Sequence, residues 1–309
     1  MFMRFDIVSF GSCVLDAFVF TDLPEKKNFI AYPVGSKILI KDLKFDVGGG
    51  GLNTSTTFSR MKLKAGLICK IGKDGSGKKI LSEIKKEKIN FLGKVQGTSG
   101  FSVVLDSKFR RRTILTYKGA NDSIRLNEIP NFETNWIYLA SLLGESLKTQ
   151  KKLARMLKNK KTKIAFNPSS YLIEKEDLRE ILELTDILVI NKEEAEMLEK
   201  KSGKLSDLIE IVCVTDGEKP FFCYTNGEKY KIFPHQNVKA VERTGAGDAF
   251  ASGFVAALIK TNDIVKALQV GVANSESVIR YFGSRNKVLN WNEALDAVRK
   301  NPCRVVRVR

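Results

Sequence analysis

Short apolar runs alternate with helical stretches between residues 136 and 215, and this alternation constrains the fold more than any other feature. The runs contain β-branched residues, as strands do, and comprise Trp136–Ala140, Lys163–Phe166, Ile187–Ile190 and Ile211–Thr215. The helical stretches between them are Leu147–Leu157, Lys175–Leu184 and Glu193–Lys200. Apolar strands in regular alternation with helices predict a parallel sheet with helices on both faces, and hence an α/β fold.

Several earlier segments have the pattern of strands but do not alternate with helices. They are Leu15–Phe20, Ile38–Phe45, Phe101–Leu105 and Thr113–Tyr117. We expect them to form a small separate sheet, set over the ligand-binding end of the larger one.

A hairpin is expected at Phe221–Tyr224 and Lys229–Phe233, because the Asn226-Gly227 pair between them is a strong turn signal. Cys213 and Cys223 could face each other across a hairpin. The cysteine count of five is odd and includes no Cys-x-x-Cys pair, so neither a disulfide framework nor a zinc ribbon is indicated.

The chain carries 52 basic and 35 acidic residues, a net charge of +17. Basic surfaces of this kind can bind nucleic acid by neutralising phosphates. However, most lysines fall on solvated helix faces among glutamates, and Arg110–Arg112 is the only dense cluster. We therefore expect no nucleic-acid partner, and a basic surface that attracts anionic substrates.

The first residues show no signal-peptide pattern, and no apolar run has the length of a membrane span. These features predict a soluble, cytoplasmic protein with no membrane partner. The single histidine, His235, excludes a metal site of several histidines and leaves acid–base work to carboxylates or lysines. We expect it on a surface turn.

The segment Thr244–Asp248, Thr-Gly-Ala-Gly-Asp, runs directly into an apolar helix. Its glycines bare backbone N–H groups at a helix N-terminus, where the helix dipole also favours anions. Asp248 follows on the first turn. An anion site with a carboxylate beside it is what phosphoryl transfer to a hydroxyl requires.

Polar residues follow other strands of the predicted sheet. Gly48–Asn53 contains four consecutive glycines before a helix, and Asp16 follows the first strand, where it could hold the hydroxyls of a polyol. Asn191 and Glu194 open a helix, and either a helix cap or a site for Mg²⁺ waters explains them. Thr215–Gly217 is foremost a turn.

Together these motifs resemble the ribokinase-like (PfkB) carbohydrate kinase family over nearly the whole chain. The matching segments occur in the family's order and are Asp16, Gly48–Asn53, Gly72–Gly77, Gly119–Asn121, Asn191–Glu194, Thr215–Gly217 and Thr244–Asp248. The resemblance implies a Rossmann-like, three-layer α/β/α fold with a small β-sheet lid. The chain would be one kinase domain over residues 1–309, with a lid formed by about residues 14–46 and 98–118 inserted in it.

The resemblance also implies phosphorylation of a hydroxymethyl group on a small sugar, with ATP and Mg²⁺. Asp248 would be the general base, and Gly245, Ala246 and Gly247 would form the anion hole. Asp16, Gly49 and Asn53 would bind the acceptor. Asn191, Thr215, Gly217 and Asn274 would lie on the nucleotide side, and Glu194 with Asn191 would hold the metal through water.

Glu242-Arg243 departs from the Asp-Thr pair that the family usually has before its Thr-Gly-Ala-Gly-Asp run. Since that segment's carbonyls often help to hold a monovalent cation, K⁺ dependence is left undecided. A nucleoside kinase of the same fold and a catalytically silent, ligand-binding relative remain as alternatives. A homodimer formed through the lid is a further expectation, because edge strands favour pairing.

Overall fold

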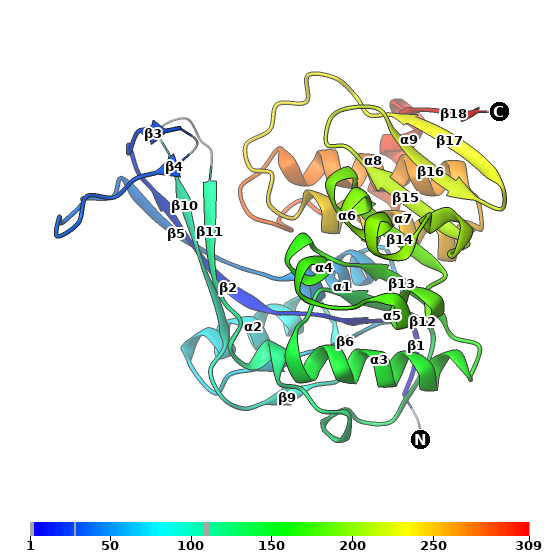
Figure 1. The fold of residues 1–309 in the computed structure, drawn as a ribbon, viewed down its shortest axis with the longest axis horizontal. Helices are drawn as coiled ribbons and strands as arrows, with labels where there is room; N and C mark the ends of the chain where they lie inside the picture. The colour runs from blue at the N-terminus through cyan, green and yellow to red at the C-terminus, as the bar shows by residue number, and fades with distance from the viewer. Residues whose placement is uncertain (1–2, 28, 108–111, 309) are drawn as a thin grey trace.

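The computed structural model describes residues 3–27, 29–107 and 112–308. A ten-stranded sheet forms the centre of the molecule (Figure 1). Its strands, in spatial order, are β18 (Arg304–Val308), β17 (Glu228–Phe233), β16 (Phe221–Thr225), β15 (Ile211–Thr215), β14 (Ile187–Asn191), β13 (Lys163–Asn167), β12 (Phe132–Ala140), β1 (Met3–Phe10), β6 (Ala65–Ile68) and β8 (Asn90–Phe91). From β15 to β8 every pair is parallel, whereas β16, β17 and β18 are antiparallel additions.

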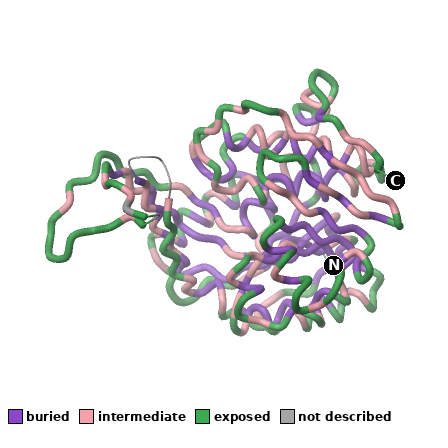
Figure 2. The backbone as a smooth tube through the Cα atoms, turned by 45° about the horizontal axis from the view of Figure 1, so that its top comes forward, coloured by how far each residue is buried: buried purple, intermediate pink, exposed green. Residues whose placement is uncertain are grey.

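Helices cover both faces of this sheet, as the alternation predicts. One face packs against α1 (Gly50–Arg60), α7 (Ala246–Thr261), α8 (Ile264–Ile279) and α9 (Trp291–Lys300). The other packs against α3 (Gly144–Lys158), α4 (Ser170–Lys175), α5 (Arg179–Leu184) and α6 (Lys192–Ser202). Successive strand residues face opposite layers, so Ile187 packs with α7 while Leu188 packs with α6. The central strands are therefore buried on both sides (Figure 2).

A separate four-stranded sheet projects from the core (Figure 1), and its two edge strands are largely exposed. Its spatial order is β11 (Arg112–Tyr117), β10 (Gly100–Asp106), β2 (Val14–Phe20) and β5 (Asp42–Gly48). Its base packs on α2 (Gly75–Lys86) through a cluster that includes Leu15, Val47 and Ile80. We refer to this four-stranded sheet as the lid.

The remaining elements are short. They are the pairs β3 (Glu25–Lys26) with β4 (Phe29–Ile30) and β7 (Lys70–Ile71) with β9 (Lys94–Val95), and the 3-10 turns η1 (Gly119–Asp122), η2 (Leu126–Glu128) and η3 (Leu205–Asp207). Among the helices described, none is both long and apolar enough to cross a bilayer.

Two local expectations are corrected, and one strand was missed. The strand expected at Ile38–Phe45 begins only at Asp42, where pairing with β2 starts, because Leu39 and Ile40 are solvent-exposed and lie outside the sheet. The helix expected at Lys175–Leu184 is split, since Glu176 is extended and the Asp177 carboxylate accepts the N–H of Arg179. The last strand, β18, was not expected.

The predicted hairpin is confirmed, and Cys213 pairs in register with Cys223 across β15 and β16. All five cysteines are buried and free. They therefore act as small core residues and not as a disulfide framework.

Candidate active site

A cavity of about 330 Å³ opens at the carboxyl ends of β14 and β15, beside the N-termini of α1 and α7. Parallel strands bring their carboxyl ends to one edge, so residues that are distant in sequence meet there. The polar residues that line it include Ser12, Asn167, Asn191, Glu194, Thr215 and Asp248. This is the edge at which the sequence placed the phosphoryl-transfer motifs.

The start of α7 has the backbone geometry of an anion-binding turn, and we refer to it by that name. Gly245 has left-handed backbone torsion angles, with φ 80°, and the helix begins at the next residue. The N–H groups of Gly245, Gly247 and Asp248 have no hydrogen-bond partner among the described residues, whereas the N–H of Ala246 donates to the Arg243 carbonyl at 3.3 Å. Free N–H groups at a helix N-terminus bind anions. The structure thus favours Gly245, Gly247 and Asp248 as donors over Ala246.

Asp248 lies in the cavity and is held by Asn53. The Nδ2 of Asn53 donates to Oδ2 of Asp248 at 2.8 Å, across 195 residues of sequence. Burial raises the pKa of Asp248 above its usual value, although the Asn53 hydrogen bond opposes this by favouring the carboxylate. A carboxylate with a raised pKa and one free oxygen is a suitable proton acceptor.

Asp16 lies on the lid strand β2, close to Asn53 but outside the cavity lining. A methyl group built on Gly48 would lie 2.7 Å from Oδ2 of Asp16 and 3.7 Å from Oδ1 of Asn53. In the lid register Asp16 faces Asp46 on one side and Ser102 on the other. Burial raises the pKa of Asp16 to about 7, the Ser102 hydrogen bond opposes this, and the Asp46 charge adds to it.

Gly49 occupies the turn between β5 and α1, where only glycine fits. Its φ is 100°, and a methyl group built on it would lie 2.5 Å from the Ser12 carbonyl oxygen. That carbonyl accepts the N–H of Gly51, so the end of β1 and the start of α1 are joined directly. The predicted glycine requirement here is a backbone requirement.

Asn191 and Glu194 form a reciprocal cap at the start of α6. The Asn191 side chain accepts the N–H of Glu194 at 2.9 Å, and the Glu194 carboxylate accepts the N–H of Asn191 at 3.0 Å and that of Ser170 at 3.1 Å. Burial raises the pKa of Glu194 and its backbone hydrogen bonds oppose this. Both residues also line the cavity. The cap and the proposed metal role are compatible, since each carboxylate oxygen keeps a free lone pair.

A second cavity of about 260 Å³ adjoins the first around the start of α7. Its lining includes Thr215, Gly217, Phe250 and His235. His235 is not a free surface residue, because its Nδ1 lies 2.8 Å from the Glu276 carboxylate. Thr215, Gly247 and Phe250 line both cavities, so the two spaces meet at the anion-binding turn.

Asn274 lies outside both cavities, contrary to its predicted place on the nucleotide side. It is fully buried between α7 and the segment before α9. Its Nδ2 donates to the Ala249 carbonyl at 2.7 Å, and its Oδ1 accepts the N–H of Leu289 at 2.9 Å. Both ends of its amide are therefore engaged in hydrogen bonds within the protein.

Three residues near the site were missed or undervalued by the sequence analysis. Ser284 donates to Oδ1 of Asn53 at 3.1 Å. Arg112 of the lid forms an ion pair with Glu242, before the anion-binding turn. Of the cluster Arg110–Arg112 only Arg112 falls within the described residues. The arginine cluster and the departure at Glu242 were visible in the sequence, but nothing linked them.

The sequence matches the pfkB family carbohydrate kinase profile over residues 4–291, and the chain belongs to this family. It is therefore a kinase with the ribokinase-like α/β fold. It is 25% identical over 307 residues to the nucleoside kinase of Methanocaldococcus jannaschii, covering 96% of this chain and 97% of that protein. It is 26% identical over 280 residues to a ribokinase of Haemophilus influenzae, covering 85% and 90%.

The structure is similar to the crystal structure of the Methanocaldococcus jannaschii nucleoside kinase, with a TM-score of 0.81 and 22% identity. The match covers 96% of this chain and 99% of that one. At this identity the likeness establishes the fold, including its lid.

Proposed function

We propose that this kinase transfers the γ-phosphoryl group of ATP to a hydroxymethyl group of a small, ribose- or fructose-like sugar, with Asp248 as the general base. One observation carries the proposal: the Asp248 carboxylate, fixed by Asn53, lies on the helix turn that presents the free N–H groups of Gly245 and Gly247. A proton acceptor and an anion site thus share one helix turn.

In the proposed reaction Asp248 accepts the proton of the attacking hydroxyl through its carboxylate. The N–H groups of the anion-binding turn stabilise the negative charge on the transferring group. Each such donor is typically worth about 10²–10³-fold in rate, and a general base roughly 10²–10⁴-fold. Asp16 and Asn53 orient the acceptor, and the Gly49 turn places the start of α1 against them.

The nucleotide would occupy the two cavities, with its phosphates at the start of α7 and its base beside Thr215 and Gly217. A putative ribokinase II from E. coli with the same fold was crystallised with ATP and Mg²⁺. The oxygen-only donor set of Asn191 and Glu194 suits Mg²⁺ held through water. When bound, the ion would neutralise phosphate charge. Asn274 does not contact either cavity, because both ends of its amide bond within the protein.

A nucleoside acceptor is the second candidate, because the M. jannaschii nucleoside kinase matches over nearly the full length of this chain. A catalytically silent relative is disfavoured, since a sensor would have no need for Asp248 beside a free anion site. The K⁺ site is left open, because Glu242-Arg243 stands in the segment that would supply its carbonyls.

The lid also supports the proposed homodimer. Leu43 and Phe45 on β5, and Ile114, Leu115 and Tyr117 on β11, are exposed on its two edge strands. Exposed apolar edge strands pair readily with a second copy. Sedimentation equilibrium of the wild type and of Leu115→Lys tests this, and a monomeric wild type would refute it.

A coupled assay for ADP release tests the function, with ribose, fructose, 2-keto-3-deoxygluconate, adenosine, inosine and cytidine as acceptors. We expect turnover with a sugar, and a loss of about 10²–10⁴-fold in Asp248→Asn. Turnover only with nucleosides would select the second candidate. If calorimetry detects ligand binding but no ADP is released with any of these acceptors, the silent relative would be supported.

A further inference from the structure

The segment between α8 and α9 carries two buried polar residues, Ser284 and Arg285, each only 3% exposed. Polar side chains buried to this extent are normally hydrogen-bonded, and both are. Neither takes part in the proposed reaction so far. Their contacts connect this segment to the base.

Ser284 fixes the orientation of the Asn53 amide. Its Oγ lies 3.1 Å from Oδ1 of Asn53, an atom that can only accept, so the hydroxyl must donate. The Nδ2 of Asn53 is thereby directed to the Asp248 carboxylate, 2.8 Å away. A flipped amide would set two acceptor oxygens against each other at Asp248. The Asp248 carboxylate, which can only accept, therefore selects the amide orientation, and the hydrogen bond from the Ser284 hydroxyl to Oδ1 restrains the amide in that orientation.

The backbone of Ser284 packs against the anion-binding turn. A methyl group built on Gly245 would lie 2.2 Å from the Ser284 carbonyl oxygen. A methyl group built on Gly48 would lie 2.8 Å from Oγ of Ser284 and 2.7 Å from Oδ2 of Asp16. The residue thus stands where the acceptor side and the anion site meet.

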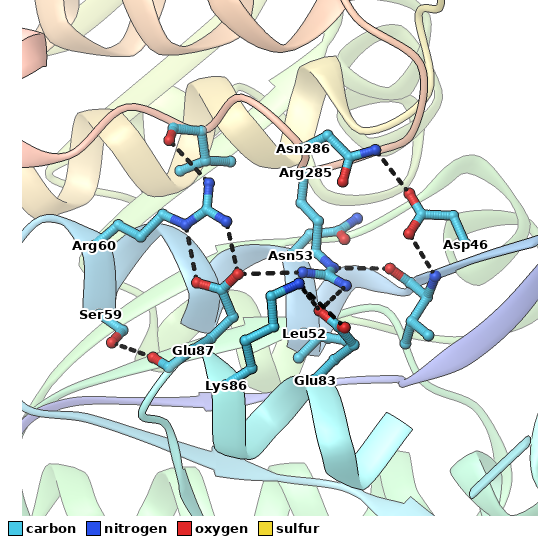
Figure 3. A network of polar contacts seen from close by, with 12 residues as sticks. Asp46, Leu52, Asn53, Ser59, Arg60, Glu83, Lys86, Glu87, Arg285 and Asn286 are labelled. Carbon is cyan, nitrogen blue, oxygen red and sulfur yellow. Dashed lines mark hydrogen bonds and ion pairs between the residues drawn. The ribbon is translucent and has the colours of Figure 1, made fainter. Parts of the chain in front are cut away.

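Arg285 anchors this segment to the base of the lid and to α2 (Figure 3). Its Nε donates to the Val47 carbonyl at 2.8 Å, and its Nη2 donates to Glu83 at 3.0 Å. Its Nη1 lies 3.5 Å from Glu87, which also accepts two hydrogen bonds from Arg60 at 2.9 and 2.6 Å. Glu83 also pairs with Lys86 at 3.3 Å, so Arg60, Arg285 and Lys86 surround the carboxylates of Glu83 and Glu87 in a largely buried network (Figure 3).

The network also holds the segment at a second point, after Arg285. Arg60, on α1, donates to the Val288 carbonyl at 3.1 Å, three residues beyond Arg285. Burial alone would raise the pKa of Glu83, but hydrogen bonding and the charge of Arg285 hold it below its usual value. The ionised form of the pair is therefore favoured. A segment tied at both points keeps Ser284 in a fixed place.

We infer that Ser284 is a positioning residue for the base: its hydroxyl locks the Asn53 amide so that Nδ2 holds the Asp248 carboxylate in place. Arg285 maintains this arrangement by tying the segment to β5 and α2. The inference rests on the proposed role of Asp248. It adds a chain of contacts, from Arg285 through Ser284 and Asn53 to Asp248, which we call the relay. Arg285 and Ser284 act in it without touching the substrate.

The test is Ser284→Ala, with kcat and KM measured across pH in the full-length enzyme. Loss of the locking hydrogen bond should lower kcat about three- to tenfold, as expected for about 1 kcal/mol. KM for ATP should not change, and the acid limb of the kcat profile should move to higher pH, because the carboxylate loses support. Ser277→Ala is the matched control, since its hydroxyl bonds the Lys287 carbonyl at 2.7 Å in the same region but away from Asn53.

A double-mutant cycle with Asn53→Ala separates positioning from general stability. If Ser284 acts through Asn53, Ser284→Ala should have less than about a twofold effect in the Asn53→Ala background. Independent, multiplying effects would overturn the inference. Arg285→Lys should reduce kcat of the folded fraction by about the same factor as Ser284→Ala. A near-normal kcat in Arg285→Lys would refute the role of Arg285 as an anchor.

A readout without turnover keeps this inference separate from the proposed function. Titration of the Asp248 carboxyl, followed by ¹³C NMR, should show a higher pKa in Ser284→Ala than in the wild type. An unchanged titration would overturn the relay even in an active enzyme. If the wild type has no kinase activity but the pKa of Asp248 is still higher in Ser284→Ala than in the wild type, the proposed function is refuted and the relay is upheld.

Discussion

Arg112 of the lid strand β11 forms an ion pair with Glu242, whose Oε1 also accepts the N–H groups of Arg243 and Thr244, at 2.8 and 2.9 Å, and the Thr244 hydroxyl, at 2.7 Å. One carboxylate therefore orders the approach to the anion-binding turn and contacts the lid at the same time. These contacts connect the lid to the anion-binding turn.

Replacing Arg112 by Gln should weaken this coupling. The ion pair is partly exposed, so we expect about a threefold to tenfold loss in kcat/KM for the acceptor, corresponding to about 1 kcal/mol. Steady-state kinetics at low and high salt would measure it, since salt should slow the wild type more than the variant. Arg179→Gln, at an exposed pair with Asp177, serves as the control. Equal salt sensitivity in both enzymes would argue against the coupling.

Asp16 should make acceptor binding depend on pH. Its pKa of about 7 means that it gains the charged, purely accepting form only as the pH rises through neutrality. If it holds the acceptor's hydroxyls, KM for the acceptor should fall over this range, and Asp16→Asn should abolish the dependence while raising KM. A pH-independent KM in the wild type would contradict this role.

The same carboxyl should affect stability with the opposite trend. Its folded-state pKa lies above the unfolded value, so the folded protein binds more protons between about pH 4 and 7 and loses stability as the pH rises. Asp16→Asn should therefore be more stable than the wild type at pH 8, by on the order of a few kcal/mol, with the gap closing toward pH 4. Denaturant unfolding at the two pH values would measure the difference.

Gly49→Ala should be strongly destabilising. The φ of 100° is a glycine conformation, and the new methyl group would lie 2.5 Å from the Ser12 carbonyl oxygen. A loss of about 3 kcal/mol in the free energy of unfolding is expected from strain and overlap together. Gly75→Ala is the matched control, because a methyl group there meets nothing within 4 Å. Similar unfolding midpoints for the two variants would refute the backbone requirement.

Asn274→Ala should act on stability and not on ATP binding. The substitution leaves the Leu289 N–H without its partner, and the Ala249 carbonyl, which lies within α7, loses the additional bond from the Asn274 amide. Unsatisfied buried groups cost about 1–3 kcal/mol each, so the melting temperature should fall by several degrees. KM for ATP in the folded variant should equal that of the wild type, and a large increase would restore the nucleotide-side assignment.

Periodicity predicted the central sheet because its strands are buried on both faces, and their apolar runs are a local signal. The start of α7 was also predictable from a local signal, because the glycines at 245 and 247 lie directly at the beginning of the apolar helix. Asp248 could be selected because it follows this turn immediately and because a single histidine left few alternative bases.

The contacts that orient the base could not be predicted, because they join residues that are remote in sequence. Asn53 and Ser284 are 231 residues apart, and a serine between two helices carries no local sign of its partner. Asn274 was misplaced for the converse reason: its position along α8 was compatible with the cavity, but only the packed structure shows that its amide is already engaged. The start of the lid strand β5 was predicted too early, because Leu39 and Ile40 are apolar but exposed, and pairing begins only at Asp42.

The two cavities meet at the first turn of α7, so the candidate active site consists of two separate spaces on either side of this turn. If the proposed roles hold, changes in the lid segments away from the Arg112–Glu242 ion pair would alter the shape of the acceptor space and leave the start of α7 in place. Substrate choice is in this sense modular, and it can diversify in evolution while the chemistry is inherited unchanged.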